Sequence, residues 1–555
     1  MVDSPSLKGQ TGQTVENQAP PLEGINLYDG DVCLGEAVAA CGGAGRSERL
    51  GRLGARLGSV EVLDWGRQAN RNPPELRTHD RFGARINEVE FHPAWHELMA
   101  LGMAAEVHAR PWNDESAGSH VERSASLFLL AQVESGVCCP LSMTFAGLPT
   151  LRRQPELARE WEPRLRARDY DRRSLPAERK TSATLGMALT EKQGGSDLRA
   201  NVTKAEPRGG GGPGEAYLLT GHKWFFSAPM SDAFLTLAYS PGGLSCFLVP
   251  RWLPDGERNR FALVRLKDKL GNRSNASSEI EYQGTWARMV GEEGRGVRSI
   301  IDMVQHTRLD SATASAGLMR QALAQAVHHA RHRRAFQRRL VEQPLMETLL
   351  ADLALESEAA TWLALRAAEA FDRGRDDPAE RAFARVATAV AKFWVCRRAP
   401  GFVFEALECL GGNGYIEESI LPRLYREAPV NSVWEGCGNV ICLDVLRAFA
   451  KDRDALDALM AEIGRAKGLD KALDRRIADL GALMAKPAAL EPRARGLVES
   501  LALVLQAGLL LSRGAPAVAE AFCRSRLAPR DALGYGALPD LPRPAELVER
   551  AAPRV

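Results

Sequence analysis

The chain has 555 residues, which is too long for one hydrophobic core and predicts about three to five domains. Its content of 45% hydrophobic and 26% charged residues is typical of a globular protein. A net charge of +2 excludes a chain that is strongly basic throughout, so nucleic-acid binding would need a local patch. The ten cysteines are scattered without a C-x-x-C pair, which excludes a zinc ribbon and favours a reducing cytoplasm. The start of the chain has no apolar signal, and the longest apolar run, near Leu501–Leu511, is too short to span a bilayer. We therefore expect a cytoplasmic protein without a membrane segment.

The first part of the chain predicts a flexible leader followed by a helical domain. Residues 1–24 are polar and rich in Gly, Gln and Pro, which is typical of a disordered segment. Over residues 25–183 apolar side chains recur at helical spacing, as at Leu129, Val133 and Val137. This range is predicted to be an N-terminal α-helical domain.

Residues 184–290 predict a middle domain of antiparallel β-structure. Short β-rich segments alternate with turns rich in Gly, Pro and Asn, and the glycine run Arg208–Gly214 indicates an exposed loop between two of them. The predicted strands are Ala216–Thr220, Phe234–Tyr239, Cys246–Val249, Phe261–Leu266 and Ser278–Tyr282.

Helices return in residues 291–450, beginning with a long amphipathic helix marked by Val297, Leu318 and Val327. The last hundred residues, 451–555, predict a further helical domain. The fold class is therefore α+β, with a middle β domain between helical domains and an extra helical domain at the end.

Three glycine-containing segments are candidates for binding a flat, anionic ligand. Thr190-Glu-Lys-Gln-Gly-Gly-Ser-Asp197 combines hydroxyl groups with a loop whose backbone N–H groups are free to bind phosphate. Leu410-Gly-Gly-Asn-Gly-Tyr415 is a second such loop. In Pro429-Val-Asn-Ser-Val-Trp-Glu435-Gly-Cys-Gly-Asn439 a single carboxylate lies on a turn just before a predicted helix, whose N-terminus would face an anion. Each segment alone is more often an ordinary surface turn.

Two further segments accompany these loops. Gly221-His-Lys-Trp-Phe-Phe-Ser227 is an aromatic strand, and it is equally typical of a sheet core. Arg333-Arg-Ala-Phe-Gln-Arg-Arg-Leu340 closes the long helix, where a basic run also complements the helix dipole.

Together these segments resemble the acyl-CoA dehydrogenase family, whose helical, β, helical order also matches the predicted domains. The resemblance implies an FAD cofactor bound by residues 291–450 together with the middle β domain. It puts Thr190 near the flavin ring, Ser196 near the phosphate and Phe225, where the family usually has Trp, against the ring. Arg333 and Phe336 would reach the FAD of a neighbouring subunit, although Gln337 replaces the family's usual Gly. The implied cofactor residues are Met187, Ala188, Leu189, Thr190, Glu191, Lys192, Gln193, Gly194, Gly195, Ser196, Phe225, Phe226, Ser227, Arg333, Phe336, Gly411, Gly412, Val433, Trp434, Gly436, Cys437, Gly438, Asn439, Val440, Ile441, Cys442 and Leu443.

The family's catalytic-base position falls on Glu435. The resemblance implies that this carboxylate removes a proton α to a thioester carbonyl while the flavin accepts a hydride from the β carbon. Trp434 either narrows the substrate channel or simply packs in the core. Arg308 matches an arginine near the family's active site, and it could equally form an ion pair with Asp310.

The resemblance is closer to the AidB-like subfamily, which is associated with the response to DNA alkylation. It rests on Pro73–Leu76, Phe91–His96, Met143–Ala146, Glu191–Ser196, Lys267–Ala276 and Leu421–Glu427, and on the extended length of the chain. It implies a homotetramer that binds double-stranded DNA without sequence preference through residues 451–555 and retains weak or vestigial dehydrogenase activity. That range has 17 Lys and Arg against 14 Asp and Glu, so an ordinary solvated helical domain is the alternative. The candidate DNA-binding residues are Arg475, Arg476, Arg493, Arg495, Arg513, Arg524, Arg526 and Arg530.

The competing function is a fully active dehydrogenase for a branched-chain (isovaleryl-type) or unusual acyl-CoA. A metal site is not expected. His92 with His96, and His328 with His332, have helical i, i+4 spacing but lack the H-E-x-x-H pattern. No G-x-G-x-x-G follows a predicted strand, so a Rossmann nicotinamide site is not supported.

Overall fold

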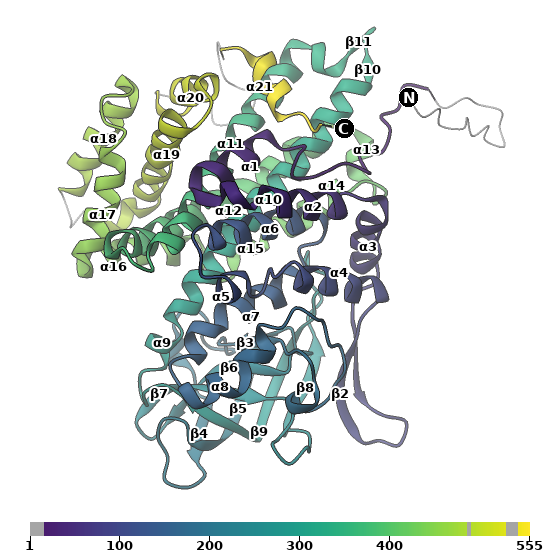
Figure 1. Ribbon diagram of the computed structural model, residues 1–555, viewed down its shortest axis with the longest axis vertical. Coiled ribbons are helices and arrows are strands. Elements are labelled where there is room, and N and C mark those ends of the chain that lie inside the picture. The colour runs from purple at the N-terminus through teal and green to yellow at the C-terminus, as the bar shows by residue number, and fades with distance from the viewer. Residues whose placement is uncertain (1–15, 486–489, 529–534, 536–541, 555) are drawn as a thin grey trace, which may run out of the picture.

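The computed structural model describes residues 16–485, 490–528, 535 and 542–554. A β domain forms one end of the molecule, helices form the other, and a helical lobe projects from the side of the helical end (Figure 1). This arrangement confirms the α+β fold class with a middle β domain.

The N-terminal helical region packs around α6 (Ser119–Val133), which is buried along its whole length. Helix starts follow local chemistry, since Asp31 and Ser59 accept hydrogen bonds from backbone N–H groups in the first turns of α1 and α3. The helices are α1 (Val32–Val38), α2 (Ser47–Leu57), α3 (Val60–Arg71), α4 (Pro93–Ala104), α5 (Arg110–Asn113), α6, α7 (Cys138–Leu151) and α8 (Pro155–Leu165).

Two features of this region differ from the prediction. The strands β1 (Glu75–His79) and β2 (Arg85–Glu90) form an antiparallel hairpin within the range predicted to be helical. Residues 16–24 are not a free leader, because Leu22 is buried and the Pro20 carbonyl is hydrogen-bonded to the His328 ring (2.8 Å). Residues 1–15 lie outside the described residues.

The middle domain is a seven-stranded sheet in the order β3-β5-β4-β6-β7-β9-β8. Most pairs are antiparallel as predicted, but β3 and β4 each pair with β6 in parallel. The strands are β3 (Leu185–Ala188), β4 (Lys204–Pro207), β5 (Ala216–Ser227), β6 (Ala233–Ser240), β7 (Gly243–Pro250), β8 (Phe261–Leu266) and β9 (Ser277–Val290).

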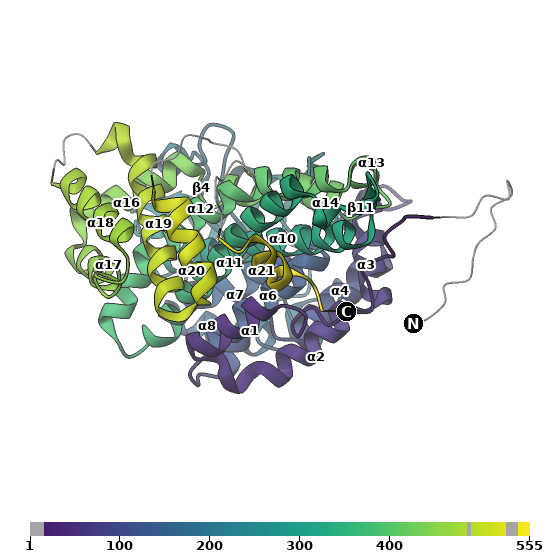
Figure 2. The ribbon, with the colours of Figure 1, turned by 90° about the horizontal axis from the view of Figure 1, so that it is seen from above.

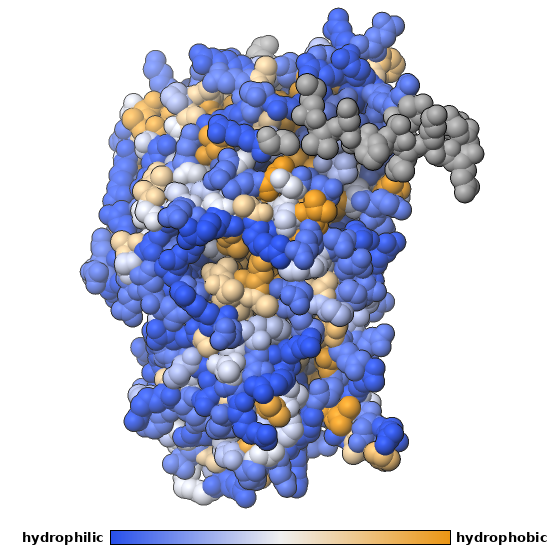
Figure 3. Space-filling view, turned by 45° about the vertical axis from the view of Figure 1, so that its right-hand side comes forward, coloured by the Kyte–Doolittle hydropathy of each residue, from blue (hydrophilic) through white to orange (hydrophobic). Residues whose placement is uncertain are grey.

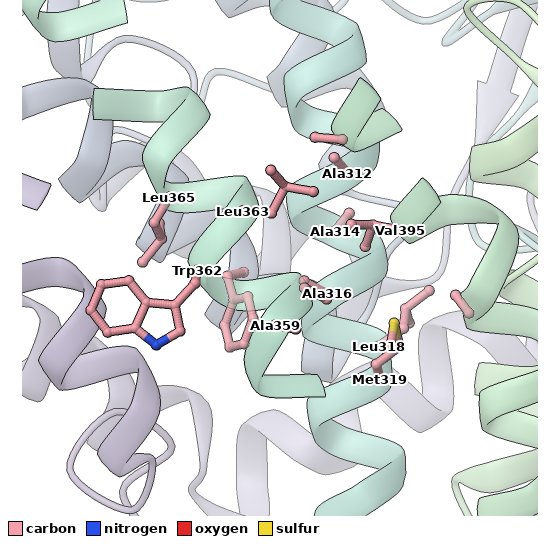
Figure 4. Packing of buried hydrophobic residues seen from close by; sticks show 14 of the residues in the cluster. Ala312, Ala314, Ala316, Leu318, Met319, Ala359, Trp362, Leu363, Leu365 and Val395 are labelled. Atoms are coloured by element: carbon pink, nitrogen blue, oxygen red, sulfur yellow. The ribbon is translucent and has the colours of Figure 1, made fainter. Parts of the chain in front are cut away.

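The core of the helical end is a bundle of α10 (Ile301–His332), α11 (Pro344–Arg373), α12 (Pro378–Cys409) and α16 (Gly438–Lys451). Small residues of α10, such as Ala312 and Ala316, face larger ones of α11, such as Leu363, which lets the helices approach closely (Figure 4). The shorter elements around the bundle are α9 (Gly296–Ser299), β10 (Arg334–Ala335), β11 (Arg338–Arg339), α13 (Gly412–Tyr415), α14 (Leu421–Glu427) and α15 (Val430–Val433).

The C-terminal region forms a lobe beside the bundle, and its last helix returns to α11 (Figures 1 and 2). The stretch Glu491–Arg513 is long and apolar enough to cross a membrane, but 67% of its most apolar window is buried inside the protein. It packs as a core helix of the lobe against α11, α12, α16 and α18. The face of the molecule in Figure 3 is mainly hydrophilic, with scattered apolar side chains. The helices are α17 (Arg453–Gly464), α18 (Lys471–Met484), α19 (Ala494–Arg513), α20 (Pro516–Phe522) and α21 (Pro544–Ala551).

Candidate active site

Glu435 lies on a tight connection between α15 and α16. Its φ of 59° is in the left-handed region, and Gly436 follows with a φ of 103°. The left-handed region is unfavourable for a residue with a side chain, so the surroundings have to stabilise this turn. Gly436 allows the chain to reverse into α16, as the glycine pattern predicts.

Two cations hold the carbonyl groups of this turn. The Arg308 Nε on α10 donates to the Glu435 carbonyl at 3.0 Å, and the Lys392 Nζ on α12 donates to the Gly436 carbonyl. The turn is therefore fixed from both neighbouring bundle helices. Sequence reasoning missed Lys392, since a lysine within a helix usually faces solvent and only its apolar flanks, Ala391 and Phe393, indicate burial.

The ion-pair partner of Arg308 is Asp444 on α16, at 2.6 Å. Arg385 binds the same carboxylate at 2.9 Å. The proposed alternative pairing of Arg308 with Asp310 is wrong, because Asp310 forms a buried pair with Arg123 of α6. Asp444 and Arg385 were also missed, because partners this far apart in sequence leave no local pattern.

The surroundings of the Glu435 carboxyl group increase its affinity for a proton. Burial raises the pKa of Glu435 above the usual glutamate value, while the Thr307 hydroxyl and the charges of Arg308 and Lys392 partly oppose this rise. A carboxylate with a raised pKa is a stronger base than a free one. The site can therefore remove a proton from a weakly acidic carbon.

The predicted flavin segments of the β domain lie side by side. Met187 pairs with Ser227 across β3 and β5, and the Trp224 N–H donates to the Thr190 carbonyl at 2.9 Å. A Cβ on Gly194 would approach the Asp197 carbonyl to 2.7 Å, so the loop needs glycine there to keep its shape. This cradle of backbone and hydroxyl groups fits a flavin ring and its phosphate.

The side chains of this segment divide into two groups. Phe225 is 47% exposed beside the loop, where it is available to a flat ligand. Phe226 points into the sheet core against Phe234, and Glu191 is a buried partner of Lys223 at 2.7 Å. Only backbone atoms of Phe226 and Glu191 are available to a cofactor. Ser196, Lys192 and the rest of the loop from residue 192 to 196 are partly or fully exposed.

The β domain approaches Glu435 through one partly buried cluster. Ser227 pairs with Ser277 across β5 and β9, and the Ser277 hydroxyl accepts from Lys269 at 3.0 Å. The charges of Lys269 and Glu435 both act on the Cys139 thiol at the start of α7. The predicted ring-binding strand and the predicted base thus face one region of the molecule.

The remaining predicted cofactor residues fall into two places. Val433, Trp434, Gly436, Cys437, Gly438, Asn439, Val440, Ile441, Cys442 and Leu443 surround the Glu435 turn, with Ile441 and Cys442 buried in the bundle. Arg333, Phe336, Gly411 and Gly412 lie at the opposite end of the bundle, near α13 and the β10–β11 hairpin (Figures 1 and 2). The structure therefore does not bring this second group to Glu435 within one chain.

The separation has a direct geometric cause. Arg308 lies near the start of α10 and Arg333 directly follows its end, 25 positions further along, which is about 38 Å at roughly 1.5 Å per residue. At the far end, Phe336 is 93% exposed on a turn with positive φ. The N-terminal segment covers part of this end, where Asn17 binds Arg334 and Gln18 binds Asn413.

The structure changes the set of candidate DNA-binding arginines. Arg526 is buried in ion pairs with Asp352 and Glu356, and Arg513 pairs with Glu369 at 2.7 Å, so both stabilise the contact with α11. The prediction that Arg526 contacts DNA is wrong, because its side chain is buried. Arg513 is less available to DNA, because its guanidinium is paired with Glu369. Arg495 donates to Asn439 at 2.8 Å beside the Glu435 turn. Arg475, Arg493 and Arg524 are exposed, Arg476 is half-buried, and Arg530 lies outside the described residues.

The histidine pairs have other partners. His96 is hydrogen-bonded to the Tyr170 hydroxyl at 3.0 Å and His328 to the Pro20 carbonyl. In the described part of the chain no group of three or more His, Cys, Asp or Glu side chains is arranged to hold a metal ion.

Family models match most of the chain. Residues 17–172 match the N-terminal domain of the adaptive response protein AidB, 186–285 the acyl-CoA dehydrogenase middle domain and 294–450 the acyl-CoA dehydrogenase C-terminal domain. AidB of Escherichia coli (strain K12) is 46% identical over 516 residues, which cover 93% of this chain and 94% of that protein.

Solved structures agree with this. Caenorhabditis elegans ACDH-11 in complex with C11-CoA superposes with a TM-score of 0.84 at 28% identity, over 94% of each chain. An acyl-CoA dehydrogenase from Bacillus anthracis complexed with FAD has a TM-score of 0.65 at 18% identity, over 84% of this chain and 82% of that one, which shows a shared fold. With this fold, the Glu435 turn and the near full-length match, the chain belongs to the AidB-like branch of the acyl-CoA dehydrogenase family.

Proposed function

We propose that this protein is an FAD-containing, acyl-CoA dehydrogenase-like protein whose catalytic base is Glu435. The observation that carries the proposal is the Glu435 turn, in which burial raises the pKa of the carboxyl group while Arg308 and Lys392 hold the backbone carbonyls of Glu435 and Gly436. A positioned base of this kind is what the removal of an α proton from an acyl thioester requires.

FAD is the cofactor of this family, and the residues present fit it. The loop from Met187 to Ser196 and the exposed ring of Phe225 would hold the isoalloxazine side, and the free N–H groups at the start of α16 would face phosphate. When bound, the flavin supplies the acceptor for the substrate's hydride.

The chain's own residues define the rest of the chemistry. Glu435 accepts the α proton, and Arg308 fixes its position through the Glu435 carbonyl. Trp434 lies next to the base, and among the described residues its buried indole N–H has no hydrogen-bond partner. In this proposal the ring borders the space open to an acyl chain. A bulky neighbour of this kind restricts the acyl group and supports weak activity toward common substrates.

We also propose a homotetramer in which a second copy completes each flavin site. Within one chain the Glu435 turn and Arg333 lie at opposite ends of α10, a separation too large for one dinucleotide. An exposed hairpin that ends in Phe336 suits a contact with a neighbouring copy rather than with water.

A second function, sequence-independent binding of double-stranded DNA in the response to alkylation damage, is supported by a different observation. Arg475 and Arg493 are exposed on the C-terminal lobe, and in the described part of the chain neither has an ion-pair partner. Unpaired guanidinium groups suit phosphate contacts. All ten cysteines are free, which supports the proposed cytoplasmic location.

The two functions are tested on the same FAD-loaded protein. Anaerobic titration with straight-chain, branched and long acyl-CoAs should bleach the flavin with at least one substrate, and duplex DNA should bind with an affinity that falls as salt rises. Rapid bleaching by isovaleryl-CoA without DNA binding at low salt would favour the alternative, a fully active branched-chain dehydrogenase.

A further inference from the structure

Lys392 is a buried cation with an unusual set of partners. It lies on α12 inside the bundle with 1% of its surface exposed, and its Nζ donates to the Gly436 carbonyl. Among the described residues no carboxylate lies within ion-pair distance of it. Burying an ammonium group beside only a backbone carbonyl is costly, so its presence at this position needs an explanation.

The groups around Lys392 point to that role. The charged and titratable groups that act on it are Cys396 on its own helix, Glu435 and Cys437 on the turn, and Arg308 on α10. Burial raises the pKa of the Cys396 thiol, which is therefore neutral. Glu435 is the carboxylate in this set, and it is close enough for its charge to interact with Lys392 without a direct ion pair.

Among the described residues no cation forms a direct ion pair with the Glu435 carboxylate. Lys392 of α12 and Arg308 of α10 bind consecutive carbonyl groups, those of Gly436 and Glu435. The backbone of Glu435 has a φ of 59°, a conformation that costs about 1–3 kcal/mol unless the surroundings enforce it. A cation that bound the carboxylate directly would compete with the substrate's proton, whereas one that binds the next carbonyl does not.

We propose that Lys392 is a positioning residue for Glu435, which holds the turn through the Gly436 carbonyl and places a positive charge near the carboxylate. The inference rests on the proposed role of Glu435 as the base. The Lys392 side chain makes two contributions: its hydrogen bond fixes the geometry of the turn, and its charge favours the ionised form of the Glu435 carboxylate.

Two substitutions separate these contributions. Lys392→Met removes both the hydrogen bond and the charge at similar volume, and Lys392→Gln keeps an N–H donor for the carbonyl without a charge. Thr388→Val is the matched control, since Thr388 lies one turn away on α12 and its buried hydroxyl has no hydrogen-bond partner among the residues that the structure describes. Loss of a buried, unpaired charge is often tolerated, so the variants should fold, and melting temperature and flavin content check this.

The first readout needs no turnover. Absorbance of the bound flavin is followed from low to high pH in substrate-free protein, and the transition that is missing in Glu435→Gln belongs to Glu435. In Lys392→Met and Lys392→Gln this transition should move to higher pH, because the positive charge that favours the ionised carboxylate is gone. Thr388→Val should leave it in place.

The second readout is the plateau rate of flavin bleaching at high pH. Lys392→Met should lose about 10-fold to 100-fold, since small misplacements of a catalytic group can cost 10²-fold, and Lys392→Gln should recover most of that loss. A Glu435 transition at the wild-type pH in both Lys392 variants, with unchanged plateau rates, would overturn the inference alone. Absence of any Glu435-dependent transition in the FAD-loaded wild type would overturn it together with the proposed role of Glu435.

Discussion

The guanidinium of Arg526 in the C-terminal lobe is bound to the carboxylate of Asp352 in α11, and both side chains are buried, with 2% and 3% exposed. Glu356, one turn further along α11, lies 3.4 Å from the same guanidinium. Arg366 of α11 makes a matching contact with Glu462 of α17 at 2.8 Å. The lobe is therefore joined to the bundle by buried charges and cannot be removed without leaving charges behind.

Substitution of Arg526 should destabilise the whole protein. Arg526→Ala removes one partner of a buried ion pair, which typically costs about 3–5 kcal/mol. Arg524→Ala, two residues earlier on an exposed position, should change the unfolding free energy by less than about 0.5 kcal/mol. Denaturant unfolding of both FAD-loaded variants measures this, and equal stabilities would show that the buried pair contributes little.

Point substitutions are consequently the appropriate test of DNA binding. Arg475→Glu and Arg493→Glu should each weaken duplex binding, and the salt dependence should fall by about 0.9 log units per log unit of salt for each phosphate that the variant no longer neutralises. Arg81→Glu makes the same charge change on the exposed tip of the β1–β2 hairpin and serves as the control. If Arg475→Glu and Arg493→Glu bind duplex DNA as tightly as the Arg81→Glu control, the DNA site does not lie on the C-terminal lobe.

The protein should lose stability on mild acidification. Burial lowers the pKa of His96 and of His108 to about 4, and that of His306 to about 3. The unfolded chain takes up these protons as the pH falls below about 6.5 while the folded chain does not, so the unfolding free energy decreases between about pH 6.5 and 4.

His306→Phe tests this directly. The His306 ring packs against Phe145 and Phe371, with centroids 4.9 and 4.8 Å away, and in the described part of the chain its Nδ1 has no hydrogen-bond partner. Phenylalanine should therefore fit and make the fall of the melting temperature with acid less steep. His79→Phe on the exposed hairpin is the control, and parallel pH curves for wild type and His306→Phe would contradict the prediction.

The proposed homotetramer, in which a second copy completes each flavin site, predicts complementation between subunits. Glu435→Gln lacks the base, and Arg333→Gln lacks a cation at the opposite end of the bundle, so each homo-oligomer should be impaired. Mixed oligomers formed by subunit exchange should contain some sites with both native residues and regain part of the activity. No recovery despite verified exchange would mean that each chain binds its flavin alone.

The family-specific segments made much of the site predictable. Thr190, Phe225 and Glu435 each lie in a short segment whose glycines or aromatic residues restrict the local backbone, so the sequence alone made them candidates, and their roles stay predictions. The predicted FAD cofactor and AidB-like family are confirmed by the matches over nearly the whole chain.

Long-range contacts were not predictable in the same way. The Arg308 partner, Asp444, lies 136 residues away, and the neighbouring Asp310 was the obvious local choice. The sequence suggests that Arg526 is a surface residue, because its position in a helix does not indicate that α11 buries its side chain. The β1–β2 hairpin was missed because its strands, with Glu75 and Arg77 on one face, lack the apolar alternation of a half-buried strand.

The central claim is that Glu435 is a competent base in an FAD site. Anaerobic stopped-flow mixing of the FAD-loaded protein with an acyl-CoA panel measures it, with Glu435→Gln as the matched variant. We expect bleaching in the wild type that slows as the pH falls through the raised pKa of Glu435, because the base must be ionised. The Gln variant should retain its flavin and bleach about 10²-fold to 10⁴-fold more slowly. Equal bleaching in both proteins, or a pH-independent rate in the wild type, would contradict the claim.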